Sequence, residues 1–328
     1  MKAMLLERFG EPEESFRLGE VPRPQAGPGE IVIRVEATSV NPIDCRLRRG
    51  LHPQLAPPLP AVLHGDAAGV VAEVGDGVTD LRVGDAVYAL IGQGALAEYA
   101  VLDARLAARI PGTCSMAEAA ALPVVGLTAW YGLIERARLR PGQRALIHAA
   151  AGGVGHIALQ LARWAGAVVA ATASTPEKLA IARQLGAHAA IDYRSQSVES
   201  YVRELTDGLG FDVVFDTVGK DNLDRSLEAA RPFGQVVTAS ARSTHDLTPL
   251  HSKSLTLHGI FTLLQVRLGV GLEQHGAALA RIAELVDAGH VRPLLDERRF
   301  TFEQVAEAHR HAESGQAVGK ITLTNPWM

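Results

Sequence analysis

A glycine-rich turn between an apolar strand and a helix is the feature that most constrains the fold. Residues 146–155 read Leu-Ile-His-Ala-Ala-Ala-Gly-Gly-Val-Gly. Apolar residues predict a strand at 144–149 and a helix at 154–165, which Gly166 ends. Such an order of strand, turn and helix is typical of the first unit of a dinucleotide-binding sheet.

The spacing within this turn indicates how it would hold a pyrophosphate. In the pattern G-x-G-x-x-G, Ala150 takes the first place, Gly152 the third and Gly155 the sixth. Gly152 lets the backbone approach the phosphates, Gly155 lets the helix pack on the strand, and the helix N-terminus offers N–H groups. The predicted cofactor-binding residues of the turn are Ala151, Gly152, Gly153, Val154 and Gly155.

From about residue 117 onward, strands alternate with helices. This alternation predicts a parallel, doubly wound sheet, and thus an α/β fold. In such a sheet, Val218 and Ser240, which follow the fourth and fifth strands, belong to the carboxyl edge where cofactors bind. The six predicted strands are 144–149, 167–173, 189–193, 211–216, 235–239 and 255–262, and the later helices are 174–186, 198–205 and 222–230.

The two ends of the chain have a different pattern. Residues 30–41 alternate apolar and polar, as in a half-buried strand, and turn signals punctuate short apolar runs over 65–90. Such strands predict a β-rich barrel or sandwich. Beyond the sheet, residues 279–286 carry a helical stripe, Thr301 and Gln304 form a capping box, and 321–323 predict a last strand.

The end of the second strand of the α/β region bears on the choice of cofactor. A carboxylate there would bind the ribose hydroxyls of NAD and repel a 2′-phosphate, but residues 170–174 contain none. Lys178, one turn beyond Ser174, and Tyr193 with Arg194 at the next strand end would surround a 2′-phosphate. The sequence therefore favours NADPH over NADH. In the competing reading, Ser174 only caps a helix in a box with Glu177, and Lys178 is solvated.

Composition excludes several classes of protein. The chain of 328 residues has a net charge of −4 and no basic run, so no nucleic-acid partner is expected. Two cysteines, Cys45 and Cys114, are too few for a disulfide framework or a four-thiolate zinc site. The first residues do not resemble a signal peptide, and the uncharged stretch 145–162 contains the glycine turn, so a cytoplasmic protein without a membrane partner is expected.

Several motifs resemble the medium-chain dehydrogenase/reductase superfamily, in particular its zinc-free quinone oxidoreductase branch, which includes ζ-crystallin. The resemblance covers nearly the whole chain. It implies a GroES-like β-rich catalytic domain from residues 1–121 and 263–328, an inserted Rossmann domain over 122–262, and a homodimer joined through the last Rossmann strand. The motifs that carry it are residues 41–44 (Asn-Pro-Ile-Asp), 65–70, 119–123 with Thr128 and Ala129, 148–155, and 319–321 (Gly-Lys-Ile).

The same resemblance bears on zinc. Zinc-dependent relatives carry a catalytic Cys, a His, and a Cys or Asp, and the matching positions here are Asn41, Gly65 and Val125. Glycine and valine cannot ligate zinc, and asparagine is a poor ligand. No metal is therefore expected. The alternative is a shifted site that uses His64 with Asp44 and Cys45.

Without a metal, direct hydride transfer to a quinone or conjugated enone is the expected reaction, because the developing negative charge is delocalised. Alcohol oxidation would need a metal or a general base. Asn41, Thr128 and His64 are the predicted catalytic residues, although Asn41 before Pro42 also suits a turn and Thr128 a helix interior. By resemblance, Phe261 and Thr262 contact the carboxamide, and Lys320 occupies a recurrent position at the cofactor site.

Three functions stay open at this point. The leading one is an NADPH-dependent quinone oxidoreductase. The alternatives are an NADPH-dependent reductase of enones or 2-alkenals with the same fold, and an NADPH-binding protein without turnover. All three take a small molecule as ligand, and assays with quinones and enones separate them.

Overall fold

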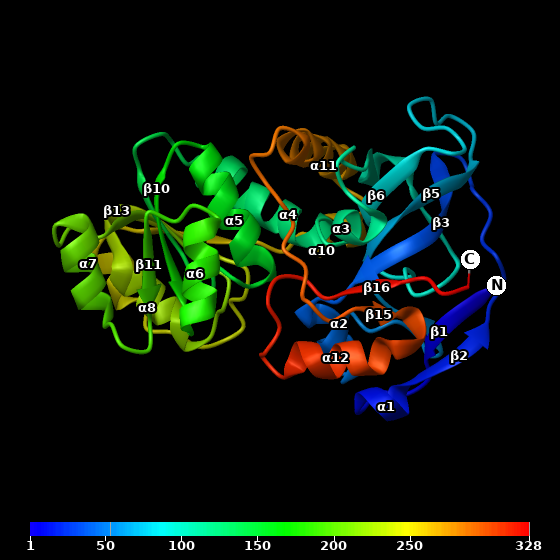
Figure 1. The fold of residues 1–328 in the computed structure, drawn as a ribbon, viewed down its shortest axis with the longest axis horizontal. Helices are drawn as coiled ribbons and strands as arrows, with labels where there is room; N and C mark the ends of the chain where they lie inside the picture. The colour runs from blue at the N-terminus through cyan, green and yellow to red at the C-terminus, as the bar shows by residue number, and fades with distance from the viewer. Residues whose placement is uncertain (53, 328) are drawn as a thin grey trace. The chain divides into compact units, whose positions relative to one another are not determined.

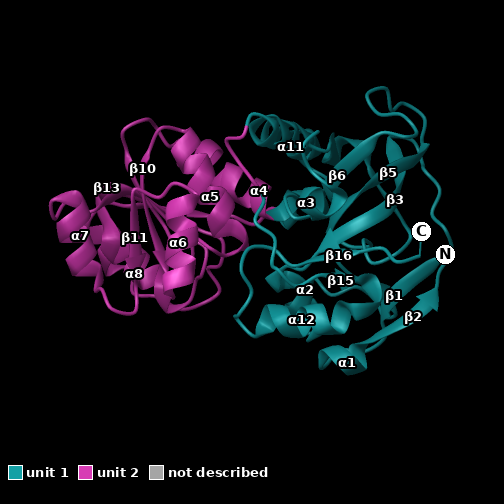
Figure 2. Ribbon diagram, viewed as in Figure 1, with its two compact units in different colours: residues 1–124, 263–288, 293–328 teal, residues 125–262, 289–292 magenta. Residues whose placement is uncertain are grey.

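The computed structural model describes residues 1–52 and 54–327. The chain forms two compact units (Figure 2). Unit 1 comprises residues 1–124, 263–288 and 293–328, and unit 2 comprises residues 125–262 and 289–292. Both ends of the chain thus belong to one unit, and the α/β unit is inserted between them. The predicted fold class, a GroES-like β-rich part with an inserted Rossmann sheet, is confirmed.

Unit 1 is built on antiparallel strands. A sheet of seven strands has the order β15-β16-β3-β5-β6-β8, with β7 also paired to β3, and a second sheet has the order β2-β1-β4. The apolar core includes Ile31, Ile33 and Leu323, all fully buried. The strands are β1 (Lys2–Leu6), β2 (Phe16–Glu20), β3 (Glu30–Ser39), β4 (Ala61–Val62), β5 (Asp66–Val74), β6 (Ala86–Leu90), β7 (Tyr99–Asp103), β8 (Ala107–Arg109), β15 (Phe300–Thr301) and β16 (Thr322–Thr324).

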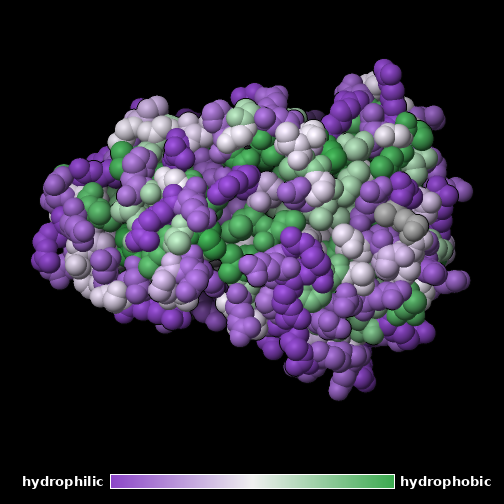
Figure 3. All heavy atoms as spheres, in the orientation of Figure 1, coloured by the Kyte–Doolittle hydropathy of each residue, from purple (hydrophilic) through white to green (hydrophobic). Residues whose placement is uncertain are grey.

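Helices flank these sheets (Figure 1). The predicted stripe on α11 is buried at Leu279, Ile282, Leu285 and Val286. The capping box of Thr301 and Gln304 is present, at a 3₁₀ turn that leads into α12. Hydrophilic side chains cover α1 and α12 on the face drawn in Figure 3. The helices of unit 1 are α1 (Pro12–Ser15), α2 (Pro42–Arg48), α3 (Met116–Ala120), α10 (Leu263–Leu268), α11 (Leu272–Asp287) and α12 (Val305–Glu313), with 3₁₀ turns at Ala104–Leu106 and Phe302–Gln304.

Unit 2 is a six-stranded parallel sheet with the order β11-β10-β9-β12-β13-β14. The strand order reverses between β9 and β12, which is where such sheets bind ligands. Helices α5 and α6 pack on β9, β10 and β11, and α8 packs on β12 and β13. The strands are β9 (Arg144–Ile147), β10 (Val168–Ala173), β11 (Ala189–Asp192), β12 (Phe211–Asp216), β13 (Ala230–Thr238) and β14 (Thr256–Gly259).

The predicted helices of unit 2 correspond to α5, α6, α7 and α8, whereas α4 and α9 were not predicted. The uncharged stretch 145–162 divides into β9, the glycine turn and α5, and no helix in residues 1–52 and 54–327 has the length and apolar character needed to cross a bilayer. Helix α4 begins in unit 1 and continues as a π-helix, Tyr131–Arg136. The helices are α4 (Pro123–Trp130), α5 (Gly153–Trp164), α6 (Pro176–Gln184), α7 (Val198–Thr206), α8 (Asp221–Ala229) and α9 (Thr248–Ser252).

Two local expectations were wrong. The N-cap of α6 is Thr175, whose hydroxyl accepts from the backbone N–H of Lys178, and not Ser174. Pro176 then occupies the first helical position, where its missing N–H costs nothing. Strand β3 is also more buried than a half-buried strand, because it lies between β5, β7 and β16 and even its polar-face residue Thr38 is fully buried.

Candidate functional site

A buried polar cluster in unit 1 contains the first predicted catalytic residue. We call Asn41, Asp44, Asp66 and Lys320 the Asn41 cluster. Asn41 lies two residues beyond β3 and caps α2, where its backbone N–H donates to Asp44 Oδ2 over 2.7 Å. Asp66 begins β5 and Lys320 precedes β16. Because β5 and β16 both pair with β3, these distant parts of the sequence meet at one end of the sheet.

Hydrogen bonds within the Asn41 cluster fix the orientation of the Asn41 amide. Asn41 Nδ2 donates to Asp66 Oδ2 over 2.7 Å, and Lys320 Nζ donates to Asn41 Oδ1 over 2.6 Å. Lys320 Nζ also donates to Val40 O at 3.0 Å and to Asp66 Oδ2 at 3.4 Å. The three ammonium donors are therefore all used. The second N–H of the amide has no acceptor among the described residues.

Burial sets the electrostatics of the Asn41 cluster. Asn41, Asp44, Asp66 and Lys320 are each at most 5% exposed. Burial, helped by the nearby charge of Asp66, raises the pKa of Asp44 to about 7. Burial also lowers the pKa of Lys320, and the carboxyl groups of Asp66 and Asp44 oppose that shift. Asp44 and Asp66 hold the neighbouring backbone in place, because their oxygens accept from backbone and side-chain donors.

His64, another predicted catalytic residue, lies in the core of unit 1. Its side chain is fully buried, with Nε2 2.9 Å from Nε2 of His309 and the two rings stacked. Its Nδ1 lies 3.4 Å from the Thr38 hydroxyl. Burial, with a smaller effect from Lys320, lowers the pKa of His64 to about 3. His64 is therefore a neutral core residue in this structure, and its pairing with α12 is a tertiary contact that local sequence does not reveal.

The glycine turn of unit 2 has the geometry that a pyrophosphate requires. Gly152 caps α5 with no side-chain hydrogen bond, so the first N–H groups of the helix are left for a ligand. A Cβ at Gly155 would lie 2.1 Å from the carbonyl oxygen of Ala149, so only glycine fits there. Ala151, Gly153 and Val154 complete the same turn. The turn therefore combines open backbone N–H groups with a close approach at Gly155, and phosphate binding by these residues stays a prediction.

The pairing of β12, β13 and β14 places Val218, Ser240 and Phe261 at neighbouring strand ends, on the carboxyl edge of the sheet. Asp216 is paired with Thr238, and Thr238 with Gly259. Val218, Ser240 and Phe261 each lie two residues beyond these positions, so three strands end side by side. Val218 and Phe261 are 50% and 40% exposed, whereas Thr262 is buried.

Asp216 is a buried residue at this strand edge that the sequence analysis did not single out. Its fully buried carboxylate accepts from the N–H groups of Val218 and Gly219 and from Nδ2 of Asn222. It also accepts from the Thr238 hydroxyl at 3.3 Å. Asp216 thereby ties the end of β12 to β13 and shapes the turn at Val218. A strand-end Asp followed two residues later by Val-Gly was the available signal, since Asp commonly accepts from the N–H two residues on.

Two of the residues predicted to surround a 2′-phosphate, Ser174 and Tyr193, directly follow neighbouring strands of the sheet. Ala173 is paired with Asp192, so Ser174 and Tyr193 follow at adjacent strand ends. Lys178 lies in the first turn of α6, and its backbone N–H is bound to Thr175 Oγ1. No ion pair engages the Lys178 ammonium within the described residues. Thr128 lies elsewhere in unit 2, buried on α4.

The possible donors of a shifted metal site are engaged in other contacts. His64 Nε2 faces His309, and Asp44 accepts from Asn41. Burial raises the pKa of the Cys45 thiol, which opposes the thiolate that a metal needs. Residues 1–52 and 54–327 contain no group of three or more His, Cys, Asp or Glu side chains placed to hold a metal ion.

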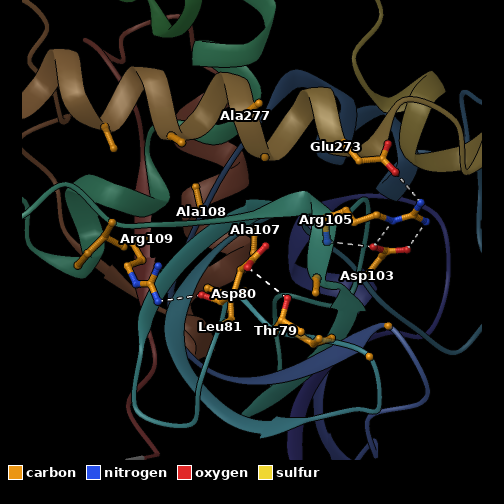
Figure 4. A pocket seen from close by; sticks show the side chains of 18 of the residues that line it. Thr79, Asp80, Leu81, Asp103, Arg105, Ala107, Ala108, Arg109, Glu273 and Ala277 are labelled. Carbon is orange, nitrogen blue, oxygen red and sulfur yellow. Dashed lines mark hydrogen bonds and ion pairs between the residues drawn. The ribbon is translucent and has the colours of Figure 1, made fainter.

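A separate hollow of about 770 Å³ lies in unit 1 between α11 and the loops around residues 77–81 and 103–110. Figure 4 shows Arg105 paired with Asp103 and Glu273, and Arg109 turned toward Asp80. None of the predicted site residues lines this hollow. The arginines of this hollow, Arg105 and Arg109, are paired with acids, so we assign no chemistry to it.

Comparison with known proteins agrees with this geometry. Residues 27–112 match the alcohol dehydrogenase GroES-like domain and residues 185–323 the zinc-binding dehydrogenase family. A 2-haloacrylate reductase from Burkholderia is 34% identical, over 98% of both chains. An alcohol dehydrogenase superfamily protein from Novosphingobium aromaticivorans is 40% identical with a TM-score of 0.93, over 99% of both chains. Escherichia coli quinone oxidoreductase, solved with NADPH, is 31% identical with a TM-score of 0.87, over 99% of this chain and 100% of that one. The chain belongs to the medium-chain dehydrogenase/reductase superfamily of oxidoreductases.

Proposed function

We propose that this protein uses NADPH to reduce a quinone or a related conjugated carbonyl, without a metal. The observation that carries the proposal is the Asn41 amide, held between Asp66 and Lys320 with one N–H still available. A preoriented neutral donor suits the oxyanion that develops when a conjugated carbonyl accepts a hydride. The Escherichia coli quinone oxidoreductase solved with NADPH is a relative over nearly the whole chain, which supports the same cofactor and substrate class.

The cofactor fits the residues of unit 2. The open N–H groups at the start of α5 would bind the pyrophosphate, and Ser174, Lys178 and Tyr193 would surround the 2′-phosphate. Val218, Ser240, Phe261 and Thr262, along the strand ends, would contact the nicotinamide half. When bound, NADPH supplies the hydride.

The residues of the chain contribute orientation and charge stabilisation. Asn41 would donate its remaining N–H to the substrate oxygen. Lys320 would bind the Asn41 side-chain oxygen and so prevent the amide from rotating. Lys320 is then a positioning residue, because its donors are already used within the chain. Thr128 would assist at the nicotinamide, and His64 would support the site only through packing.

The Asn41 cluster also supports the zinc-free part of the proposal. Asp66 accepts from Ser39, Asn41, Val124 and Lys320, so its carboxylate oxygens are occupied. The Lys320 ammonium supplies the positive charge that a metal would otherwise bring to this buried carboxylate. A zinc ion would have to displace these partners and find a replacement for Gly65 and Val125, neither of which can ligate.

The test is oxidation of NADPH by the purified protein with a panel of quinones and conjugated enones. We expect turnover with quinones, retained after exhaustive dialysis against a chelator, and a dissociation constant for NADPH below that for NADH. Asn41→Ala should lower kcat by about 100-fold while NADPH still binds, because one oriented oxyanion donor is removed. One zinc per chain by metal analysis, or equal dissociation constants for NADPH and NADH, would contradict the proposal.

A second candidate is reduction of a conjugated carbon–carbon double bond next to a carbonyl or carboxyl group. The relationship to 2-haloacrylate reductase favours it. The same residues would serve, since the developing charge again lies on an oxygen. Turnover with enones alone would identify this activity, and tight NADPH binding with no turnover on either class would identify a binding protein.

We also propose that the domains divide at residues 121/122 and 262/263, and that the protein is a cytoplasmic homodimer. The edge strand β14 pairs only with β13 among the described strands, so its outer side is free to pair with a second copy. A mass of one chain in solution by light scattering would contradict the dimer.

A further inference from the structure

A serine, a histidine and an aspartate of unit 2 are linked by two successive hydrogen bonds, and none of the three is assigned to the cofactor. Ser243 Oγ is 2.5 Å from His245 Nε2, and His245 Nδ1 is 2.8 Å from Asp224 Oδ1. Ser243 and His245 belong to the loop between β13 and α9, whereas Asp224 lies on α8. The contact to Asp224 therefore joins the loop to a helix that is 21 residues away in sequence.

The order of these contacts settles the direction of each hydrogen bond. An ionised carboxylate only accepts, so the Nδ1–H of His245 must donate to Asp224. In the neutral imidazole, Nε2 then carries the lone pair, and the Ser243 hydroxyl must donate to it. This is the arrangement in which a histidine can take the proton of a serine, with its tautomer set by a carboxylate.

Burial is distributed as a reactive serine requires. The His245 side chain is 8% exposed, so its ring is held between the loop and α8. Ser243 is exposed, so a reagent reaches its oxygen from solvent. Asp224 is 54% exposed, so its effect on the imidazole is chiefly orientation.

We propose that Ser243, His245 and Asp224 form an acyl-accepting site, with Ser243 as a nucleophile toward small activated esters. Ser243 Oγ attacks the ester carbonyl carbon while its proton moves to His245 Nε2. The bond from that carbon to the leaving alkoxide breaks as His245 returns the proton to the leaving oxygen. Water then attacks the acyl-serine with the same proton transfers, which releases the acid and restores Ser243.

The competing explanation is that His245 only anchors the loop to α8. In that case the three side chains would stabilise the loop, and Ser243 would be no more reactive than any other exposed serine. Ser195 offers a matched comparison within the same unit, because it is exposed and donates to a carboxylate, Asp192, at 3.1 Å but its hydroxyl has no histidine contact in the described residues.

The experiment uses the full-length protein with p-nitrophenyl acetate and, separately, a fluorophosphonate probe followed by peptide mass spectrometry. We expect the probe to label Ser243 and not Ser195. We expect S243A to abolish ester hydrolysis and the control S195A to retain it. H245A should lower the rate by about 100-fold, as loss of a general base does. Imidazole added to H245A should restore part of the rate, which a loop anchor would not explain.

Two further measurements keep the result interpretable. NADPH oxidation and the unfolding midpoint of each variant report whether the fold and the proposed reductase activity survive. Equal labelling of Ser243 and Ser195, or ester hydrolysis unchanged in S243A, would overturn the proposal even if the reductase proposal holds. Conversely, a protein with no reductase activity that is labelled at Ser243 would support this site alone.

Discussion

The Asn41 cluster of unit 1 and the glycine turn of unit 2 present polar groups in opposite ways. The Asn41 cluster is closed: Lys320 uses all of its donors on the chain, and Asp66 accepts from four groups. The glycine turn is open, because the N–H groups at the start of α5 have no side-chain partner. A cluster whose hydrogen bonds are all used holds one side chain in a fixed orientation, whereas a turn with unused N–H groups can bind a charged ligand. On the proposed function, unit 1 would contribute preorganisation and unit 2 would contribute binding.

The largest expected effect comes from breaking the closed cluster. Lys320→Met leaves Asp66 buried without its cation, so we expect the free energy of unfolding to fall by about 3–5 kcal/mol, as for other buried pairs that lose one partner. Urea unfolding of the variant measures this loss. In the double variant Lys320→Met with Asp66→Asn the uncompensated charge is gone, so most of the stability should return. Equal losses in the single and double variants would show that packing, and not charge, holds the cluster.

A smaller effect is expected from blocking the open turn. In Gly155→Val, the new Cβ would lie 2.1 Å from the carbonyl oxygen of Ala149. The turn must therefore shift away from its pyrophosphate-binding geometry. We expect the dissociation constant for NADPH, measured by fluorescence titration, to rise by about 100-fold, the cost of a misplacement near 1 Å. Gly259→Ala is the matched control, because a Cβ there meets nothing within 4 Å. An unchanged affinity in Gly155→Val would place the phosphates elsewhere.

Acid acts on buried histidines of both units, the His64 and His309 pair of unit 1 and His148 of unit 2, whose pKa burial lowers to about 4. Burial lowers the pKa of His64 to about 3 and that of His309 well below its usual value, with Lys320 and Arg48 acting in the same direction. Since the unfolded chain binds these protons near pH 6.5, stability is lost as the pH falls from there toward 3. His64 alone should cost about 2 kcal/mol at pH 5 relative to pH 7.

Urea unfolding at pH 7 and pH 5 measures that loss, and His309→Phe is the variant to compare. Phe16 packs edge-on against the His309 ring, so an aromatic replacement retains that packing. The variant should lose less stability on acidification than the wild type. A pH dependence equal to that of the wild type would assign the acid sensitivity to other groups.

Local sequence predicted the parts of the site that are local in the chain. The turn at 150–155, the helix that follows it and the six strands as segments of the chain all follow from apolar periodicity and glycine spacing, because their geometry depends on neighbours within a few residues. The N-cap of α6 was misplaced by one residue because Ser174 and Thr175 have similar capping preference, and Pro176 decides between them.

Contacts between distant residues were not predictable in the same way. Asn41 was identified from the sequence, but its partners Asp66 and Lys320 lie 25 and 279 residues away, and strand pairing alone brings them together. The pairing of His64 with His309 and of His245 with Asp224 is equally non-local. Sequence therefore determined the strand-turn-helix unit that would hold phosphate, because backbone geometry there is set by glycines and periodicity. Only the tertiary structure decided that the Asn41 amide is fixed by a buried ammonium and that His64 is a core residue, because burial and charge pairing depend on which strands lie side by side.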